Sequence, residues 1–451
     1  MGKDNIEKNL FLHRVLFVYV EFWHNIIFYK KVVVVNKENI PEDGNVIFTP
    51  NHQNALMDAL ALHFIIKRPL VFVARADIFK KKAVAAFLYF LKILPIYRIR
   101  DGIDSLERNK EIFAKTVDIL KAGNSLAILP EGNHGSKRRL RPLKKGFARI
   151  AFQTEEANNF GMDLKIVPIG LDYSDYESFR STLFVNFGEP ISVSDYYDLY
   201  KENAPLALNK IKDKLAESIS KVMINIKSIE YYDLYDNLRN IYSNRYCEKL
   251  GLPNSEQPNK FKADKLLIEK LEKFEIKKSA EIKSMQSLVN KYVRGLKGTK
   301  ISSSCFEKDP QSLLSLIVSS LLLILFLPFY LYGLIVNIIP YQLSLASTKI
   351  IKDRQFFSSF KMVVLMFATP IFYALETWVF SAFTTDPFKW YYFLLSLPVS
   401  GVIAWIWHSN ALKLLMHWRL FLLKTRKAKT YKLLRLMLDN IFTKTDEIVG
   451  S

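Results

Sequence analysis

Short apolar runs alternate with amphipathic stretches between residues 45 and about 190. Bounded apolar runs are typical of buried strands, and apolar residues recurring every three or four positions are typical of helices. The expected strands are residues 45–49, 70–74, 94–99, 125–129, 164–171 and 183–187, and the expected helices are residues 55–66, 83–92, 104–122 and 143–158. This alternation predicts an α/β domain with a mainly parallel sheet over residues 41–195. Functional groups should gather at the carboxyl ends of its strands.

The N-terminal segment is apolar but charged. Residues 9–30 are rich in aromatic and aliphatic side chains, yet they include His13, Arg14, Glu21, His24 and Lys30. Because an ionisable side chain inside a bilayer is costly, an in-plane or shallowly inserted helix is favoured over a span. A buried helix of the globular domain is the alternative. Residues 1–40 are therefore expected to form a membrane-associated amphipathic helix and a first strand, at residues 31–37.

The last third of the chain is predicted to include a membrane segment, residues 312–410. Residues 313–341 are uncharged, contain Pro328 and Pro340, and have basic residues on both sides. Half of this stretch, about 15 residues, covers about 22 Å of a hydrocarbon core that is roughly 30 Å thick. A re-entrant pair is therefore expected over 313–341, with a single span as the alternative. Residues 362–383 and 390–407 are expected to be two true spans.

Two other regions are helical by pattern. Residues 196–311 read as charged helices without a recognisable motif, and no function is assigned to them. Residues 411–451 alternate leucine-rich and basic positions, which predicts a basic amphipathic tail helix suited to an anionic membrane surface.

Net charge points to an anionic partner. The chain of 451 residues carries a formal net charge of +20, and 50% of its residues are hydrophobic. Such a balance suits nucleic acid or a phospholipid surface. The apolar segments favour the phospholipid membrane, and no RNP-like, helix-turn-helix or zinc pattern supports nucleic acid as a partner. Cys247 and Cys305, the only cysteines, lie far apart, which argues for a reducing, cytoplasm-facing environment and against a zinc site.

A histidine and a carboxylate follow the first buried run of the α/β pattern. His52 comes directly after Val46 to Asn51, and Asp58 follows it by six residues. On one regular helix these two side chains would not meet, but they can if His52 lies in the turn before the helix. A histidine held by a carboxylate can act as a general base, because the anion fixes its tautomer and stabilises the imidazolium. The alternative is a helix-entry histidine beside a solvated aspartate.

A glycine-rich loop and a basic run follow the strand at 125–129. Pro130, Gly132 and Gly135 permit tight turns and close approach of a ligand. Six of the nine residues from 137 to 145 are cationic. Guanidinium and ammonium groups at this place predict a phosphate site, and a solvated or membrane-facing patch is the alternative.

Two further strands have unusual residues. Arg98 and Arg100, two apart on a strand, point the same way and could each bind a phosphate or be ordinary surface arginines. Pro168 lies within the buried run 166–171, where it cannot donate a ladder hydrogen bond. That strand is therefore expected at a sheet edge, or to be broken where a ligand approaches.

Together these four blocks resemble the glycerolipid acyltransferase superfamily that carries an NHxxxxD box. The matching residues are Asn51-His52…Asp58, Pro95-Ile96-Tyr97-Arg98, Pro130-Glu131-Gly132 and Val167-Pro168-Ile169. The sequence departs from the family pattern in three places, one of them Leu129, where the family has Phe. Five residues, not four, separate His52 from Asp58, and Asn133-His134 stands where the family has Thr-Arg.

The resemblance implies transfer of a fatty acyl group from a thioester, acyl-CoA or acyl-carrier protein, to a glycerolipid hydroxyl, with no metal or other cofactor. His52 would be the base and Asp58 its partner, and the expected substrate-binding residues are Arg98, Glu131, Gly132, Arg138, Arg139 and Arg141. The expected acceptor is 1-acylglycerol-3-phosphate (lysophosphatidate), which would give phosphatidic acid, with glycerol-3-phosphate or dihydroxyacetone phosphate as the alternative. The catalytic domain would lie on the cytoplasmic face of an integral membrane enzyme. A non-catalytic membrane scaffold with a degenerate domain is the remaining interpretation.

Overall fold

The structure is a computed structural model that describes residues 6, 11–97, 105–133, 135, 137–384, 386 and 388–450. Its chain forms two compact units. Unit 1 comprises Met1–Asn225 together with Ile351–Met362, and unit 2 comprises Ile226–Ile350 together with Val363–Ser451. The catalytic domain expected at residues 41–195 thus lies inside a larger unit, which also includes a short segment from the C-terminal third.

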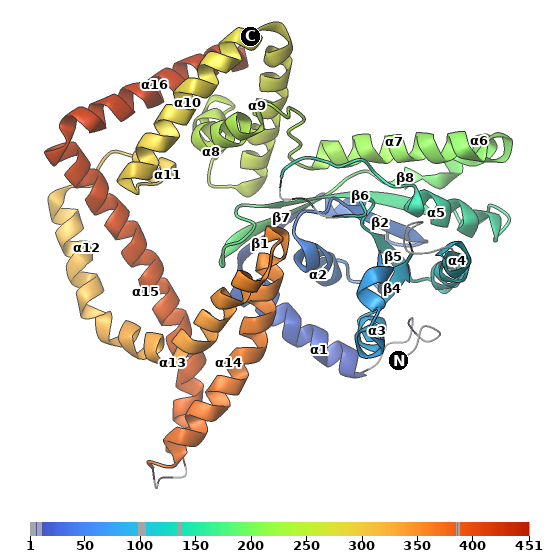
Figure 1. Cartoon of the computed structure of the whole chain (residues 1–451), viewed down its shortest axis with the longest axis horizontal. Helices are drawn as coiled ribbons and strands as arrows, with labels where there is room; N and C mark the ends of the chain where they lie inside the picture. The colour runs from blue at the N-terminus through green and yellow to red at the C-terminus, as the bar shows by residue number, and fades with distance from the viewer. Residues whose placement is uncertain are drawn as a thin grey trace. The chain divides into compact units, whose positions relative to one another are not determined.

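Unit 1 is built on one mixed, mostly parallel sheet (Figure 1). Its strands are β1 (Tyr29–Val35), β2 (Val46–Pro50), β3 (Leu70–Arg75), β4 (Ile93–Ile96), β5 (Ser125–Ile128), β6 (Lys165–Tyr173), β7 (Ser181–Phe187) and β8 (Ile191–Ser192), in the order β1-β7-β6-β2-β5-β3-β4, with β8 beside β6. Only the β6–β7 and β6–β8 pairs are antiparallel. The predicted α/β class with a mainly parallel sheet is confirmed.

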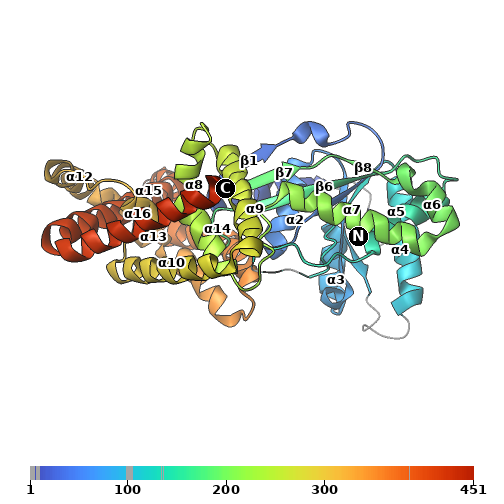
Figure 2. The same ribbon diagram turned by 90° about the horizontal axis from the view of Figure 1, so that it is seen from above.

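Helices cover both faces of this sheet. They are α1 (Phe11–Phe22), α2 (Ala55–Ile65), α3 (Lys82–Phe90), α4 (Ser105–Lys121), α5 (Gly146–Glu156), α6 (Tyr197–Glu202) and α7 (Ala204–Val222), with a π-helical turn at Trp23–Phe28 and 3₁₀ turns at Lys37–Asn39, Ala76–Phe79 and Val193–Tyr196. Side chains from α4, α5 and α7 form one buried cluster with alternate strand residues such as Ile47, Val71 and Leu126. Figures 1 and 2 show α7 lying over β6 and β8. On the opposite face, His63 of α2 contacts Phe72, so the strands are buried on both sides, as their continuous apolar runs predict.

Of the two expectations for the strand with Pro168, a sheet edge or a break where a ligand approaches, the sheet edge is wrong. β6 is an interior strand between β7 and β2. Pro168 is tolerated there because the partner of β6 on one side changes at this point: β8 pairs with residues 165 and 166, and β7 pairs with residues 169–173. The Pro168 carbonyl accepts from the Gly188 N–H (2.8 Å). The missing proline N–H therefore falls at a break in the ladder.

The N-terminal helix turns its histidines inward and its apolar residues outward. His13 and His24 are 8% and 0% exposed, whereas Phe11, Leu12 and Val18 are more than 60% exposed. The ionisable side chains that argued against a span are thus partly accommodated inside the protein. The exposed apolar face fits the expected in-plane helix, which stays a prediction.

Unit 2 is helical. It contains α8 (Tyr232–Lys249), α9 (Gln257–Lys277), α10 (Ser279–Thr299), α11 (Ser303–Phe306), α12 (Leu313–Leu325), α13 (Leu327–Ala346), most of α14 (Phe357–Ser381), α15 (Lys389–Arg426) and α16 (Ala428–Gly450), with a 3₁₀ turn at Ser347–Ile350; a further 3₁₀ turn, η8 (Arg354–Phe356), precedes α14. Among the described residues, three stretches are long and apolar enough to cross a membrane: Leu327–Ile350, Arg354–Ser381 and Lys389–Arg426. Membrane association, expected from the sequence, is thereby supported.

The C-terminal boundaries differ from the expected ones. The second half of the predicted re-entrant pair does not end at Tyr341; helical structure continues to Ile350, while α12 has only 13 residues. The last span is not separated from the tail at residue 411, because α15 continues to Arg426. The tail helix α16 buries Leu434, Leu438 and Ile441 against its neighbours α9 and α10. These three side chains are therefore part of the core of unit 2, and the expected contact of the tail helix with a membrane surface stays a prediction.

Candidate active site

The structure brings His52 and Asp58 together at the carboxyl end of β2. His52 Nδ1 lies 2.8 Å from Asp58 Oδ2, and Asp58 is fully buried. Asn51, just before, is fixed to β6 by two hydrogen bonds: its Nδ2 donates to the Leu171 carbonyl (3.0 Å) and its Oδ1 accepts from the Leu171 N–H (2.6 Å). The turn that presents His52 is therefore anchored in the sheet.

The turn before α2 accommodates the additional residue between His52 and Asp58, by which this chain differs from the family motif. Asp58 Oδ2 accepts from the backbone N–H groups of Gln53 and Asn54, both at 2.8 Å. Ala55 has a φ of +44°, a left-handed backbone conformation that residues other than glycine seldom adopt. Because the chain reverses within this turn, Asp58 returns to His52 despite the longer spacing.

Tyr173 is a third partner of the pair that sequence reasoning missed. Its hydroxyl donates to Asp58 Oδ1 at 2.7 Å, and the side chain is fully buried at the end of β6. Burial and the neighbouring Asp58 carboxylate raise the pKa of Tyr173 well above its ordinary value. The hydroxyl therefore stays protonated and remains a donor. Its position at the carboxyl end of a strand beside β2 was the signal that could have identified it.

Glu131 ties the two motif loops together through their backbones. Its carboxylate accepts from the His52 N–H (2.8 Å) and the Arg141 N–H (3.3 Å), and the residue is 3% exposed. Burial raises the pKa of Glu131 to about 8, although the two N–H groups oppose this shift by favouring the anion. The predicted contact of Glu131 with substrate stays a prediction; its described contacts position His52.

Gly132 makes the turn that the glycine-rich loop was expected to need. Its φ is +66°, and its N–H donates to the Leu129 carbonyl (3.1 Å). A Cβ there would lie 3.3 Å from Lys144 Cγ. The Gly135 N–H donates to the His52 carbonyl (3.2 Å), a second direct bond between the two loops.

The basic run divides into buried and accessible cations. Arg138 is 6% exposed; its guanidinium donates to Asp172 Oδ1 (3.0 Å) and to the Tyr173 carbonyl (2.6 Å), and it lies over the Tyr176 ring. Arg139 and Arg141 are partly buried, and Lys137 is exposed. Among the predicted phosphate contacts, Arg138 is thus held in an internal ion pair, while the other cations are open to solvent.

Arg98 and Arg100, predicted as phosphate contacts, lie outside the described residues, as does His134. The end of β4 just before them is fixed, because the backbone N–H and carbonyl of Tyr97 both bond to the Asn109 side chain (2.9 and 2.7 Å). Among the described residues, no group of three or more His, Cys, Asp and Glu side chains could hold a metal ion.

The arrangement has the geometry that a carboxylate-held general base would need. Since His52 Nδ1 faces Asp58, Nε2 is the nitrogen that would take a proton from a substrate. Asp58 in turn accepts hydrogen bonds from two backbone N–H groups and from one phenol. These bonds fix the carboxylate in place while it keeps its hydrogen bond to His52. The three strands that present these groups, β6, β2 and β5, are neighbours in the sheet.

Residues 31–172 match the model of a protein family described as Acyltransferase. This match, together with relatives named as glycerol-3-phosphate and 1-acylglycerol-3-phosphate acyltransferases, supports the glycerolipid acyltransferase superfamily for this domain. The resemblance inferred from the four motifs is therefore confirmed, and the match extends from β1 to the end of β6.

Relatives with named activities include acyltransferases of two kinds. "Glycerol-3-phosphate O-acyltransferase 2" of Saccharomyces cerevisiae is 27% identical over 280 residues, 59% of this chain and 37% of that protein. "Glycerol-3-phosphate O-acyltransferase 1" of the same yeast is 27% identical over 147 residues, 32% of this chain and 19% of that protein. "1-acyl-sn-glycerol-3-phosphate acyltransferase" of Borreliella burgdorferi is 24% identical over 199 residues, 43% of this chain and 74% of that protein. The chain thus spans less than two fifths of the length of the two yeast relatives.

Among solved structures, that of the 1-acyl-sn-glycerophosphate acyltransferase PlsC from Thermotoga maritima is 19% identical to this chain. It covers 48% of this chain and 79% of its own, with a TM-score of 0.31. A score this low supports no conclusion about shared geometry.

Proposed function

We propose that this protein is a membrane-bound acyltransferase that moves a fatty acyl group from a thioester to the free hydroxyl of 1-acylglycerol-3-phosphate. The observation that carries the proposal is the 2.8 Å pairing of His52 with the fully buried Asp58 inside a domain of the acyltransferase family. The product would be phosphatidic acid.

In the proposed reaction, His52 Nε2 accepts the hydroxyl proton while the hydroxyl oxygen attacks the thioester carbonyl carbon. The resulting imidazolium is stabilised by Asp58, to which Tyr173 and two backbone N–H groups donate. The tetrahedral intermediate then breaks its carbon–sulfur bond, and the thiol leaves with the proton returned by His52. No acyl-enzyme is needed, and the sequence has no GxSxG elbow that would supply a nucleophile.

An anionic phosphate on the acceptor fits the charge beside the base. Arg139 and Arg141 lie in the loop that Glu131 bonds to the His52 backbone, and they would hold the phosphate while the hydroxyl meets His52. Arg98 would add a contact from the end of β4. Binding energy from the phosphate would thus go into orienting the hydroxyl.

Glycerol-3-phosphate is the second candidate acceptor. One observation favours it: the alignment with a yeast protein named as a glycerol-3-phosphate O-acyltransferase runs over 280 residues, well beyond the domain match at 31–172. The relative named for the acylated acceptor is covered over 74% of its own length, which supports the first candidate.

A membrane location supports an acceptor and product that partition into lipid. Three long apolar helices, together with the exposed apolar side chains of α1 and α3 (Phe11, Leu12, Val18, Val84, Phe87), would keep the site at the bilayer surface. We place the catalytic domain on the cytoplasmic face, where acyl-CoA and acyl-carrier protein are available as donors.

The test is an acyltransfer assay on membranes that contain the protein, with each acceptor offered with each donor. We expect His52→Ala to lower turnover by about 10²–10⁴-fold, the usual contribution of a general base. His408→Ala, which changes an exposed histidine of α15, is the matched control and should keep wild-type turnover. Normal turnover in His52→Ala would refute the assignment, and use of neither acceptor would refute the proposed substrate class.

A further inference from the structure

The loop that joins β6 to β7, residues 174–180, lies beside the catalytic turn. The loop is ordered locally, because Asp175 Oδ1 accepts from the N–H groups of Glu177 (2.8 Å) and Ser178 (2.9 Å). Tyr176 sits at the centre of this turn. None of the four sequence motifs includes the loop, and the proposed reaction does not use it.

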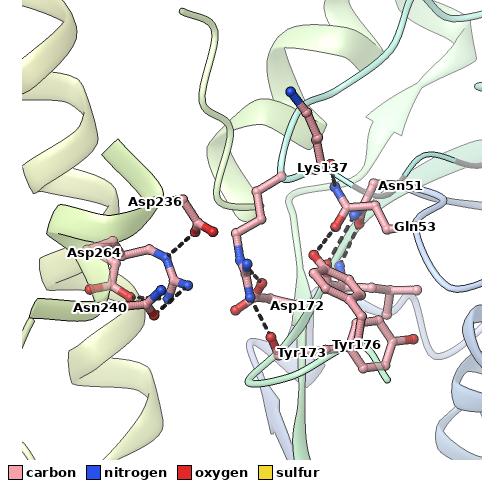
Figure 3. A network of polar contacts seen from close by, with 12 residues as sticks. Asn51, Gln53, Lys137, Asp172, Tyr173, Tyr176, Asp236, Asn240 and Asp264 are labelled. Atoms are coloured by element: carbon pink, nitrogen blue, oxygen red, sulfur yellow. Dashed lines mark hydrogen bonds and ion pairs between the residues drawn. The ribbon is translucent and has the colours of Figure 1, made fainter. Parts of the chain in front are cut away.

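Tyr176 contacts the two residues whose N–H groups hold Asp58. Its hydroxyl donates to Gln53 Oε1, and its backbone carbonyl accepts from Asn54 Nδ2 (3.3 Å). Gln53 is held from its other end too, since its Nε2 donates to the Lys137 carbonyl (3.0 Å), as Figure 3 shows. The catalytic turn is therefore fixed on one side by Tyr176 and on the other by the basic run.

The same loop is held by a segment from the C-terminal third of the chain. Ser358 Oγ donates to the Tyr176 carbonyl, the oxygen that also accepts from Asn54. Lys361 Nζ donates to the Glu177 carbonyl (2.8 Å). Ser358 and Lys361 lie three residues apart in the first turns of α14, so they share one helix face. Both belong to Ile351–Met362, the segment that is part of unit 1.

We propose that Tyr176 is a positioning residue for acyl transfer, and that the base of α14 acts on the His52–Asp58 pair through it. This inference rests on the proposed function for its activity test, but not for its structural test. One carbonyl oxygen joins the catalytic turn to the first turn of a helix that continues into an apolar stretch long enough to cross a membrane. Residues 351–362 thereby complete the catalytic unit from a distant part of the sequence.

The expected size of the effect follows from the geometry. Gln53 and Asn54 supply two of the donors to Asp58, so a shift of the turn changes how Asp58 faces His52. Turnover is sensitive to displacements of the base on the order of 1 Å. Each single hydrogen bond contributes on the order of 1 kcal/mol, so loss of one should lower turnover by roughly five- to tenfold.

The activity test compares two neighbouring serines. Ser358→Ala should lower kcat about five- to tenfold with KM changed less than twofold, and Ser358→Thr, which keeps the hydroxyl, should restore most of it. Ser359→Ala is the matched control: Ser359 is also buried, but its Oγ has no hydrogen-bond partner in the described part of the chain. We expect wild-type kcat from it. Equal kcat in Ser358→Ala and Ser359→Ala would overturn the proposal.

A double-mutant cycle separates positioning from general support of the fold. Tyr176→Phe should lower kcat in the wild-type background but by less than twofold in a Gln53→Ala background, because the amide it positions is gone. Full additivity of the two changes would contradict the proposed route through Gln53.

Hydrogen–deuterium exchange gives a readout that does not depend on activity. In the full-length protein in micelles, Ser358→Ala should speed exchange of the amides of Gln53 and Asn54, and Ser359→Ala should not. Unchanged exchange in Ser358→Ala would refute the inference. Faster exchange in Ser358→Ala, together with a wild type that transfers no acyl group, would refute the proposed function alone.

Discussion

At the scale of single residues, Asp58 is the best-connected side chain of the candidate site. It accepts from two backbone N–H groups and a phenol while facing His52 Nδ1, so both of its oxygens have defined partners. A carboxylate held this way fixes the imidazole tautomer that leaves Nε2 free of its proton.

Asp58→Asn tests the role of this carboxylate without removing volume. The asparagine oxygen would replace Oδ2, because two backbone N–H groups donate at that position, so the tautomer of His52 is kept but the negative charge that stabilises the imidazolium is lost. We therefore expect kcat to fall by up to about 10²–10⁴-fold, the usual contribution of general-base catalysis, with KM nearly unchanged. Asp213→Asn, at an exposed position of α7, is the control. A KM effect alone would mean that Asp58 binds substrate and does not stabilise the imidazolium.

Glu131 makes stability depend on pH. Its folded-state pKa is about 8 against an ordinary value of 4.5, because burial disfavours the anion. Below pH 4.5 both folded and unfolded chains hold this proton. Between pH 4.5 and 8 only the folded chain holds it, so the stability from this group is lost as pH rises, by up to about 1.4 kcal/mol per pKa unit.

Glu131→Gln, which mimics the neutral acid, should remove this pH dependence. Thermal midpoints of wild type and Glu131→Gln in detergent micelles, measured from pH 5 to pH 8.5, should show the wild type losing stability relative to the variant as pH rises. Glu281→Gln, at an exposed position of α10, should follow the wild type. A wild type that gains stability relative to Glu131→Gln over this range would contradict the raised pKa.

At the scale of elements, the start of α2 combines a functional turn with backbone strain. Ala55 adopts a left-handed φ of +44° where the longer box is accommodated. An L-residue with a Cβ pays roughly 1–2 kcal/mol for such a conformation, and glycine does not.

Ala55→Gly should therefore raise the free energy of unfolding by about 0.5–1 kcal/mol, after allowance for the greater freedom of glycine in the unfolded chain. Ala61→Gly, in the interior of the same helix, should lower it by about 1 kcal/mol. Urea unfolding of the purified protein in micelles compares the two. Destabilisation by both variants would mean that Ala55 is not strained.

Much of the catalytic unit could be predicted from the sequence because it depends on short-range patterns. The apolar runs predicted the strands to within a few residues. Because His52 and Glu131 each follow such a run, both could be expected at the carboxyl ends of the strands. Pro168 did not decide between a sheet edge and an interior strand, because a break in the hydrogen-bond ladder tolerates the missing proline N–H as well as an edge does. Arg138 looked like its basic neighbours, since only the fold brings Asp172 to it. Tyr173 and Ser358 were missed for the same reason: their contacts cross 115 and 182 residues of sequence.

At the scale of the whole molecule, contacts limit how the chain crosses a membrane. Arg435 of α16 donates to the carbonyls of Glu307 and Lys308, both at 3.3 Å, just before α12. The segments before and after the apolar helices therefore lie at the same face, so the number of crossings between them is even. Within the part of the chain that the structure describes, three helices, an odd number, are long enough to cross.

The contacts of the first turns of α14 indicate which of the three long apolar helices does not cross the membrane. Ser358 and Lys361 bind the 174–180 loop of the catalytic unit, so the chain has returned to the catalytic face before α14 enters the membrane. The helix α12, with 13 residues, covers only about 20 Å of a core roughly 30 Å thick. We therefore expect α12 and α13, which meet at a bend in Figure 1, to enter and leave at one face, and α14 and α15 to form the spanning pair.

Cysteine labelling tests this topology. In a background with Cys247→Ser and Cys305→Ala, single cysteines replace Lys308, Lys349 and Thr384. These positions lie before α12, after α13 and between α14 and α15. In sealed vesicles, a membrane-impermeant maleimide should label positions 308 and 349 from the same face and position 384 only from the other. Permeabilised vesicles, in which all three should react, control for reactivity. If position 349 reacts from the same face as position 384, α13 crosses the membrane alone. In that case one of two contacts does not exist in the membrane: that of α16 with residues 307 and 308, or that of α14 with the catalytic unit. Labelling of all three from one face would mean that α14 and α15 do not span.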